Sequence, residues 1–147
     1  MYHDHSIRAS ASGRLLDGRV AVVTGGSGAI GKAISLALVR EGATVVMAGR
    51  RVGALEAAAD EILAQVSNGG DYDKMPAQVR CAALDVTCEG QVEHFFRGVV
   101  QDHGRCDLLV NNAGTAAGGD VTDIDAATFS KVMDVNVLGP FLCSREA

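Results

Sequence analysis

The stretch VAVVTGGSGAIG, residues 20–31, decides the fold of this chain. It opens on a run of β-branched and small apolar residues, which is typical of a buried strand. Glycines follow at once, and from Ile30 onward apolar residues recur at helical spacing. A tight glycine turn between a strand and a helix brings free backbone N–H groups and the positive end of the helix dipole together, where they bind phosphate. The stretch therefore predicts a dinucleotide pyrophosphate site, because strand and helix supply the context that a glycine string alone lacks.

The glycine turn fits three fingerprints of dinucleotide-binding proteins. All three patterns end at Gly31. The general pattern also includes Gly26 and Gly28, and the pattern of extended sugar-modifying enzymes includes Gly25 and Gly28. The pattern of simple short-chain dehydrogenases includes Thr24, Gly25 and Ala29. The glycines alone do not decide among them. Under any of them, we expect the pyrophosphate to be held by Thr24, Gly25, Ser27, Gly28, Ile30 and Gly31.

The rest of the sequence alternates between short apolar runs and longer helical patterns. Strands are expected at 19–24, 43–48, 79–84 and 107–111, and helices at 30–41, 53–66, 89–103, 123–133 and from 135 onward. This alternation predicts an α/β fold, a Rossmann-type doubly wound parallel sheet that stops after about four strands. The predicted domain covers residues 15–147. Residues 1–14 are expected to be a flexible tail, and 67–76 a surface loop.

Composition excludes several classes of function. The chain has 147 residues, a formal net charge of −5 and 48% hydrophobic residues, which suits one domain with a sizeable core. Its basic residues are scattered, so nucleic acid is not an expected partner. No apolar run approaches the roughly 20 residues that span a bilayer, and the start lacks the apolar core of a secretory signal, so no membrane is expected. We expect a cytoplasmic location, while the Ser- and Arg-rich start leaves an organellar matrix open.

The four cysteines form no Cys-x-x-Cys pair and have no histidine nearby at zinc-ligand spacing. They therefore predict reduced thiols, with neither a disulfide nor a metal site. We expect no metal among the cofactors.

The end of the second expected strand reads Ala48-Gly49-Arg50-Arg51. A protein that binds NAD usually has an acidic residue at this place, about 20 residues past the glycines, to grip the ribose hydroxyls. Here no acid is present to repel a 2′-phosphate, and Arg50 and Arg51 can pair with one. The alternative is that both arginines simply begin a solvated helix. The sequence favours NADP over NAD as the cofactor.

Three further segments resemble the short-chain dehydrogenase/reductase family, and with the glycine turn they extend the likeness from Leu15 to the last residue. Asn111-Asn112-Ala113-Gly114 follows the fourth expected strand, 84–87 reads Leu-Asp-Val-Thr, and 135–141 reads Val-Asn-Val-Leu-Gly-Pro-Phe. The Asn-Asn-Ala-Gly motif resembles the simple type of the family and not the extended, epimerase-like type.

The resemblance implies roles for residues in each segment. By this likeness Asn112, Ala113 and Gly114 line the ribose side of the cofactor, Asp85 and Val86 hold the adenine, and Asn136 is the asparagine of the catalytic tetrad. That asparagine positions a water in a proton relay to the active-site lysine. Structural alternatives stay open, because an Asp after a strand often caps a helix and an Asn within a helix can satisfy nearby backbone.

The family's other catalytic residues are not found in these 147 residues. Family members use a Ser and a Tyr-x-x-x-Lys, in which the tyrosine is the general acid/base and the nearby lysine lowers its pKa. Beyond Asn136 the sequence has one serine, Ser144, and neither tyrosine nor lysine; Tyr2 and Tyr72 lie far upstream, and Pro76 stands where a lysine should follow Tyr72. We therefore expect a truncated product of a longer reading frame, inactive alone. Its uncovered fourth strand predicts marginal stability or aggregation.

The leading hypothesis is an NADP-dependent oxidoreductase that transfers hydride between an alcohol and a ketone. It implies a small-molecule carbonyl or alcohol substrate and, by the family resemblance, a homo-oligomer. The alternative hypothesis is a non-catalytic truncated isoform or pseudoenzyme that binds nucleotide or partner subunits. A third, an extended-type sugar-nucleotide epimerase, conflicts with the Asn-Asn-Ala-Gly motif. The sequence does not identify the substrate.

Overall fold

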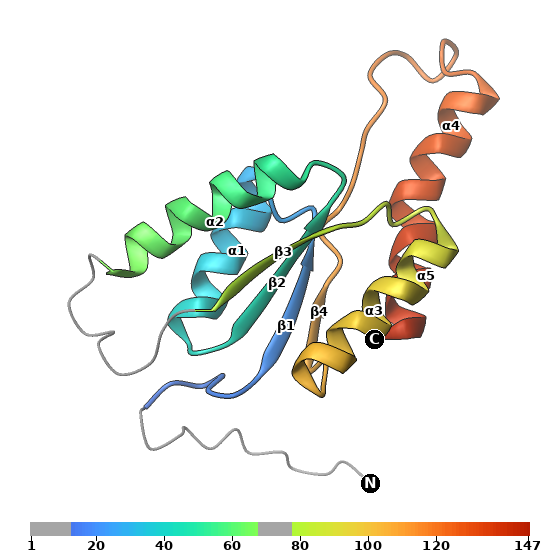
Figure 1. The fold of residues 1–147 in the computed structure, drawn as a ribbon. Coiled ribbons are helices and arrows are strands. Elements are labelled where there is room, and N and C mark those ends of the chain that lie inside the picture. Colours follow the sequence, from blue (N-terminus) through green and yellow to red (C-terminus); the bar gives the residue numbers. More distant parts are fainter. Residues whose placement is uncertain (1–12, 68–77) are drawn as a thin grey trace, which may run out of the picture.

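A computed structural model describes residues 13–67 and 78–147, which form one parallel four-stranded sheet with helices on both faces (Figure 1). In chain order the elements are β1 (Val20–Thr24), α1 (Ala29–Arg40), β2 (Thr44–Gly49), α2 (Val52–Ser67), β3 (Val79–Ala83), α3 (Glu89–His103), β4 (Leu108–Val110), α4 (Ala126–Met133), the π-helical η1 (Asp134–Leu138) and α5 (Gly139–Glu146). The strand order is β3-β2-β1-β4. The chain thus winds from β1 first to one side and then to the other, which confirms the predicted Rossmann-type sheet.

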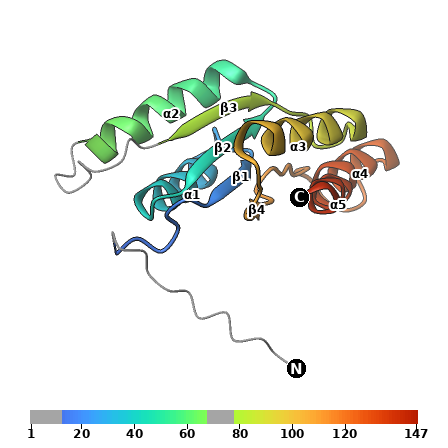
Figure 2. The same cartoon turned by 60° about the horizontal axis from the view of Figure 1, so that its bottom comes forward.

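The two faces of the sheet are covered by different helices (Figure 2). Side chains of a strand alternate between faces. Val20 and Val22 of β1 pack beneath α3 and α5, whereas Ala21 and Val23 pack beneath α1 and α2. All five residues of β1 are buried. This burial on both sides explains why the strand is apolar up to its last residue, Thr24, and shows no polar alternation.

The C-terminal helices differ in detail from the sequence-based expectation. The helix expected at 123–133 begins at Ala126, because the Asp125 carboxylate accepts the N–H of Thr128 at 2.7 Å and caps α4. From there α4, η1 and α5 run on as consecutive helical segments. The π-helical turn η1 between them was not part of the sequence-based expectation, which gave only two helical segments here.

Two predicted segments lie almost wholly outside the described residues. Of the expected tail at 1–14 the structure describes Gly13 and Arg14, and of the expected loop at 67–76 only Ser67, which ends α2. Tyr2 and Tyr72 are not among the described residues.

None of the helices in the two described ranges has both the length and the apolar character needed to cross a membrane. Nor do three or more His, Cys, Asp or Glu side chains of these ranges gather as a metal site. The four cysteines are free thiols, and burial raises the pKa of Cys143 to about 11. Cys143 is therefore an unreactive core residue.

At the amino ends of the strands, Asp107 joins β1 to the start of β4. Its carboxylate accepts the backbone N–H of Val20 at 2.9 Å, Arg19 Nη1 at 2.8 Å and Arg105 Nη2 at 2.5 Å. Burial alone would raise the pKa of Asp107, but these three donors outweigh it and hold the pKa at about 2. The ionised side chain therefore stabilises the junction of the two strands.

We predict that Asp107→Asn lowers the free energy of unfolding by about 2 kcal/mol at pH 7. Because the folded pKa lies below the ordinary value of 3.8, the contribution is complete above that value and is lost as the pH falls toward 2. Urea unfolding of the wild type and of Asp107→Asn from pH 7 to pH 2.5 measures this contribution to the free energy of unfolding. The difference between wild type and variant should shrink below about pH 4. A difference that stays constant over this range would contradict the assignment.

Candidate functional site

The carboxyl ends of β1 and β4 are tied together through Thr24. Its buried hydroxyl donates to the carbonyl oxygen of Val110 at 3.3 Å. The Thr24 hydroxyl oxygen in turn accepts the N–H groups of Asn112 at 3.1 Å and Ala113 at 3.0 Å. In return the Asn112 side-chain amide donates to the carbonyl oxygens of Thr24 and Gly25, both at 3.0 Å. These bonds hold the glycine turn against the Asn-Asn-Ala-Gly segment.

Two glycines of the turn are required by packing. Gly25 has a left-handed φ of 65°, and a Cβ there would lie 2.9 Å from Ala113 Cα. At Gly31 a Cβ would collide with the Gly25 carbonyl oxygen and lie 2.8 Å from Asn112 Nδ2. Neither position therefore accepts a side chain. Both glycines belong to the simple short-chain pattern, and the structure explains why each is there.

Gly28 differs from these two glycines. A Cβ there would meet nothing closer than the Gly25 carbonyl oxygen at 3.5 Å, an ordinary contact. Gly28 is exposed and is the N-cap of α1, and no side chain caps this helix end by a hydrogen bond in the described structure. The N–H groups of the first turn and the positive dipole end are left for an anion. The absent side chain at Gly28 keeps that approach open.

Beside the turn lies a cavity of about 220 Å³ at the carboxyl ends of the strands. Its lining includes Gly25, Ser27, Arg50, Arg51, Asp85, Val86, Ala113 and Gly114. All eight were expected from the sequence to contact a cofactor, and they come from four separate stretches of chain. The fold therefore gathers the predicted residues around one space, as parallel strands gather their carboxyl ends.

The other expected residues lie next to this cavity without lining it. Thr24 and Asn112 form the hydrogen bonds that fix its wall, and Gly31 is buried behind the turn. Ile30 is exposed over 70% of its surface at the start of α1. These residues shape the site or stand at its rim.

Five residues that line the cavity were not expected from the sequence. They are Gly49, Leu84, Thr115, Lys131 and Val135. The first three directly adjoin predicted residues, so proximity along the chain was an available signal. Val135 likewise adjoins the predicted Asn136, whereas Lys131 lies four residues before Val135 on the preceding helical segment, and only the fold shows that Lys131 reaches the cavity.

Asp85 is held as a carboxylate at the end of the strand β3. Thr87 donates to its Oδ1 from the hydroxyl at 2.7 Å and from the backbone N–H at 3.0 Å. These bonds lower the pKa of Asp85, and the nearby charge of Arg50 lowers it further against the opposing effect of burial. The Asp85 carboxylate is thus held by its own turn, and its oxygen atoms can still accept further hydrogen bonds.

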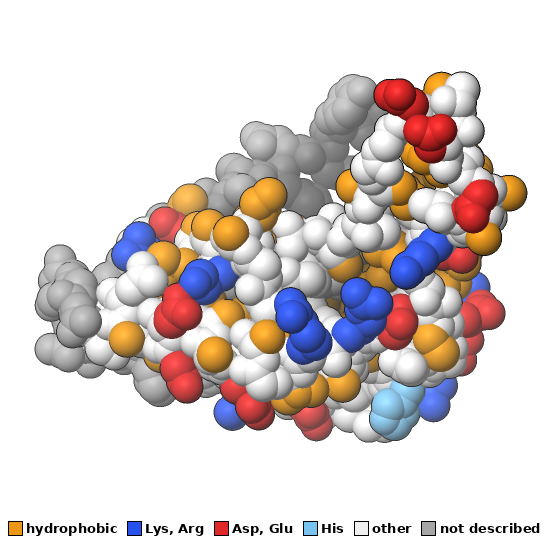
Figure 3. All heavy atoms as spheres, turned by 90° about the horizontal axis from the view of Figure 1, so that it is seen from above, with side chains coloured by type: hydrophobic (Ala, Val, Ile, Leu, Met, Phe, Trp, Pro, Cys, Tyr) orange, Lys and Arg blue, Asp and Glu red, His pale blue; other side chains and the backbone are white. Residues whose placement is uncertain are grey.

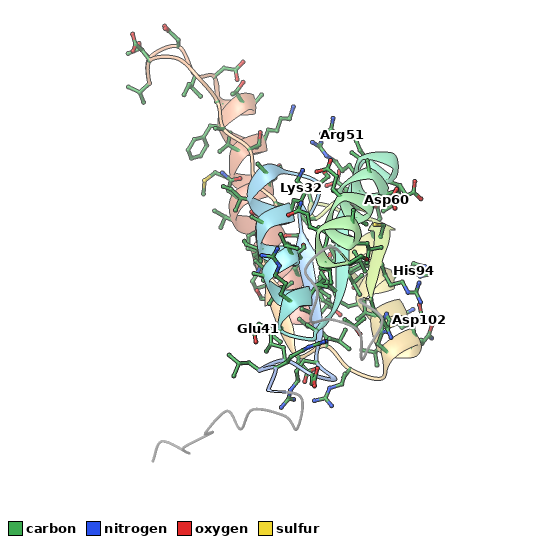
Figure 4. The ribbon with its side chains drawn as sticks, turned by 90° about the vertical axis from the view of Figure 1, so that its left-hand side faces the viewer. Lys32, Glu41, Arg51, Asp60, His94 and Asp102 are labelled. Atoms are coloured by element: carbon green, nitrogen blue, oxygen red, sulfur yellow. The ribbon has the colours of Figure 1, made fainter. Side chains whose placement is uncertain are left out.

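Basic side chains gather on the face that surrounds the cavity. Figure 3 looks down on the carboxyl ends of the strands and shows several Lys and Arg side chains across this face. Arg50 and Arg51 are exposed and directly follow β2. Figure 4 shows Arg51 at this end of the molecule, in the turn that leads into α2. The site is therefore suited to a ligand with negative charge.

Asn136 lies in the π-helical η1 and is bonded to the segment after β4. Its Oδ1 accepts the N–H of Thr115 at 2.9 Å, and its Nδ2 donates to the Thr115 carbonyl oxygen at 2.8 Å. Both polar atoms of the Asn136 side chain therefore form hydrogen bonds with Thr115, in the loop after β4. Asn136 fixes the helix to the cavity wall, next to Thr115 and Val135, which line it.

A larger cavity, about 950 Å³, lies elsewhere, between β3 and α3. His94, Asp102 and His103 line it, and Figure 4 shows His94 and Asp102 away from Arg51. It contains no residue of the glycine turn. We place the candidate site at the smaller cavity, because that cavity joins the glycine turn, the uncapped start of α1 and the cations, whereas the histidines line the other cavity.

The comparison with known families agrees with this geometry. The family model described as short chain dehydrogenase matches residues 19–147. This chain belongs to the short-chain dehydrogenase family. The match begins at β1 and includes the glycine turn, the Asn-Asn-Ala-Gly segment and Asn136.

Relatives of this short-chain dehydrogenase are similar over most of its length. A 2-(S)-hydroxypropyl-CoM dehydrogenase 3 from Xanthobacter autotrophicus is 38% identical, over 90% of this chain and 48% of that protein. Dehydrogenase/reductase SDR family member 11 from Bos taurus is 35% identical, over 88% and 48%. A metagenomic short-chain oxidoreductase, solved in complex with NADP, is 38% identical with a TM-score of 0.77, over 89% and 55%. The chain thus spans about half the length of these relatives.

We predict that alanine lowers protein stability at one glycine of the turn and weakens cofactor binding at another. Gly31→Ala should destabilise the protein by about 2 kcal/mol, because the new methyl group has no space. Gly28→Ala should leave the melting temperature nearly unchanged but weaken the binding of a nicotinamide dinucleotide by about tenfold or more, a change of about 1.4 kcal/mol. Thermal unfolding and fluorescence titration with the reduced dinucleotides measure the two effects. A Gly28→Ala variant that binds them like wild type would contradict the role of this turn.

Proposed function

We propose that this chain is the cofactor-binding half of an NADP-dependent oxidoreductase that transfers hydride between an alcohol and a carbonyl compound. The observation that carries the proposal is the pair Arg50–Arg51, which follows β2 directly and lines the cavity where an NAD-binding protein would have an acid. A guanidinium group donates two parallel hydrogen bonds to a phosphate. The 2′-phosphate that distinguishes NADP is the group that this pair can bind.

The residues present fit a dinucleotide. Gly28 leaves the uncapped start of α1 open, which suits a pyrophosphate. In this proposal Gly25, Ser27, Gly28, Ile30 and Gly31 hold the pyrophosphate, Arg50 and Arg51 the 2′-phosphate, Asp85 and Val86 the adenine, and Asn112, Ala113 and Gly114 the ribose. Thr24 keeps the turn in place through its hydrogen bonds. The nicotinamide supplies or accepts the hydride when the cofactor is bound.

Asn136 is proposed as the tetrad asparagine, on the basis of the family resemblance. Its side chain is fully engaged by Thr115, so we propose that it acts by position and not by direct contact with a substrate. The hydrogen bonds with Thr115 fix the π-helical turn, and π-helical turns are frequent at functional sites.

The solved relative in complex with NADP supports the proposed cofactor. That relative is 38% identical to this chain, which spans about half of it. The acid nearest to Arg50 in the cavity lining is Asp85, which belongs to the segment after β3 and is held by Thr87. Asp85 therefore does not take the place of the ribose-binding acid after β2.

A second candidate function is nucleotide binding without turnover. These 147 residues include no tyrosine followed four positions later by a lysine, the pair that the family resemblance implies for catalysis. Because a cofactor-binding half is expected to be inactive alone under either candidate, an assay of NADPH consumption with small aldehydes and ketones is run on the product of the whole reading frame. Turnover there supports the first candidate, and NADPH binding without turnover supports the second.

We also propose that the C-terminal helical segments bind a second copy of the chain. Large apolar side chains recur every four residues and are exposed: Phe129 by 59%, Met133 by 40%, Val137 by 53% and Phe141 by 59%. An exposed apolar stripe of this kind is typical of a protein interface. Sedimentation velocity should show self-association that Val137→Glu abolishes; a wild type that remains monomeric would contradict this proposal.

For the proposed cofactor, we predict that the chain binds NADPH more tightly than NADH. Arg50→Ala should reduce the affinity for NADPH by about tenfold or more, because a charge-assisted hydrogen-bond partner of the phosphate is removed. Its affinity for NADH should change little. Arg97→Ala removes the same charge at an exposed position of α3 that does not line the cavity, and serves as the control. Equal affinity of the wild type for the two cofactors would overturn the assignment of NADP.

A further inference from the structure

Lys131 lines the nucleotide cavity from a different wall than Arg50 and Arg51. The two arginines stand in the turn between β2 and α2, whereas Lys131 belongs to α4. All three side chains are exposed, and none forms an ion pair within the part of the chain that the structure describes. Three cations from two separate elements therefore surround one space.

The side of the helix that bears Lys131 is fixed toward the cavity. Val135, four residues later, lines the same cavity and packs against the core cluster beneath α3 and α5. Residues four apart lie on one side of a helix. The Asn136–Thr115 hydrogen bonds hold the adjacent turn to the loop after β4. Lys131 is thus directed toward the cavity by its own helix.

The cavity lining carries more positive than negative charge. Asp85 is the one acid that the described lining includes, and Thr87 already donates two hydrogen bonds to it. Asp134 lies three residues from Lys131 on the helix, yet no ion pair joins them in the described structure. An anion in the cavity would therefore gain the attraction of three cations at little cost from repulsion.

We infer that Lys131 is a further cofactor-selecting residue, which binds the phosphate on the adenosine ribose from another element of the cavity wall than Arg50 and Arg51. The inference rests on the proposed function of the site. Arginines offer a planar fork, while a lysine offers a compact charge with three donors on a flexible stem. The two kinds of cation can therefore donate to different oxygens of one dianionic phosphate. A cofactor without this phosphate gains nothing from Lys131.

The test uses two probes that differ only in the 2′-phosphate, adenosine 2′,5′-bisphosphate and adenosine 5′-monophosphate. Calorimetric titration of wild type and Lys131→Met gives the affinity for each. We expect Lys131→Met to weaken the bisphosphate by about tenfold and to leave the monophosphate nearly unchanged. Lys131→Arg should retain most of the preference, and Arg97→Met controls for the loss of one charge. Circular dichroism checks that each variant is folded.

Two results would overturn the inference. If Lys131→Met weakens both probes equally, Lys131 acts on the base or on the 5′-phosphate; if it weakens neither, the lysine has no part in binding. In both cases the wild type still prefers the bisphosphate, so the proposed function survives. A wild type that binds the two probes equally would instead reject the NADP assignment, and the role of Lys131 with it.

Discussion

The site depends on the hydrogen bonds between Thr24, at the end of β1, and the backbone after β4. A parallel strand ends in free backbone groups, and here the Thr24 hydroxyl and the Asn112 amide satisfy several of them at about 3 Å. The junction leaves no room for a Cβ at Gly25 or Gly31. Loss of the junction would separate the glycine turn from Ala113 and open the cavity. The conformation of the turn is thus a property of the sheet, and not of the glycines alone.

Charged side chains have different roles at the two ends of the sheet. At the amino ends, Asp107 is neutralised by Arg19 and Arg105, and it holds two strands together. At the carboxyl ends, Arg50 and Lys131 line a cavity without an ion-pair partner among the described residues. Paired charges at one end stabilise the fold, and unpaired charges at the other are available to a ligand. This division explains how a chain with a net charge of −5 presents a cationic site.

Much of this architecture could be predicted from the sequence, because local signals carry it. The β-branched run at 20–24, its glycine turn and the alternation that follows determine the strands, their parallel order and the place of Arg50. The approach of Lys131 to the cavity has no signal in the sequence, since it depends on how the C-terminal helices pack. The π-helical turn has no signal in the local spacing either. The helix α4 begins at Ala126, later than the expected residue 123, because Asp125 caps it. A pattern places a residue on an element, but tertiary packing decides which elements share a cavity.

We propose that a dinucleotide binds at the carboxyl ends of the four strands, and not in the larger space between β3 and α3. Amide chemical-shift mapping of the isotope-labelled chain during titration with NADP⁺ tests this proposal most directly. We predict shifts concentrated at Gly25, Arg50, Asp85 and Ala113, which line the smaller cavity. Shifts centred on His94 and the rest of the larger cavity, or the absence of shifts at saturating NADP⁺, would contradict it.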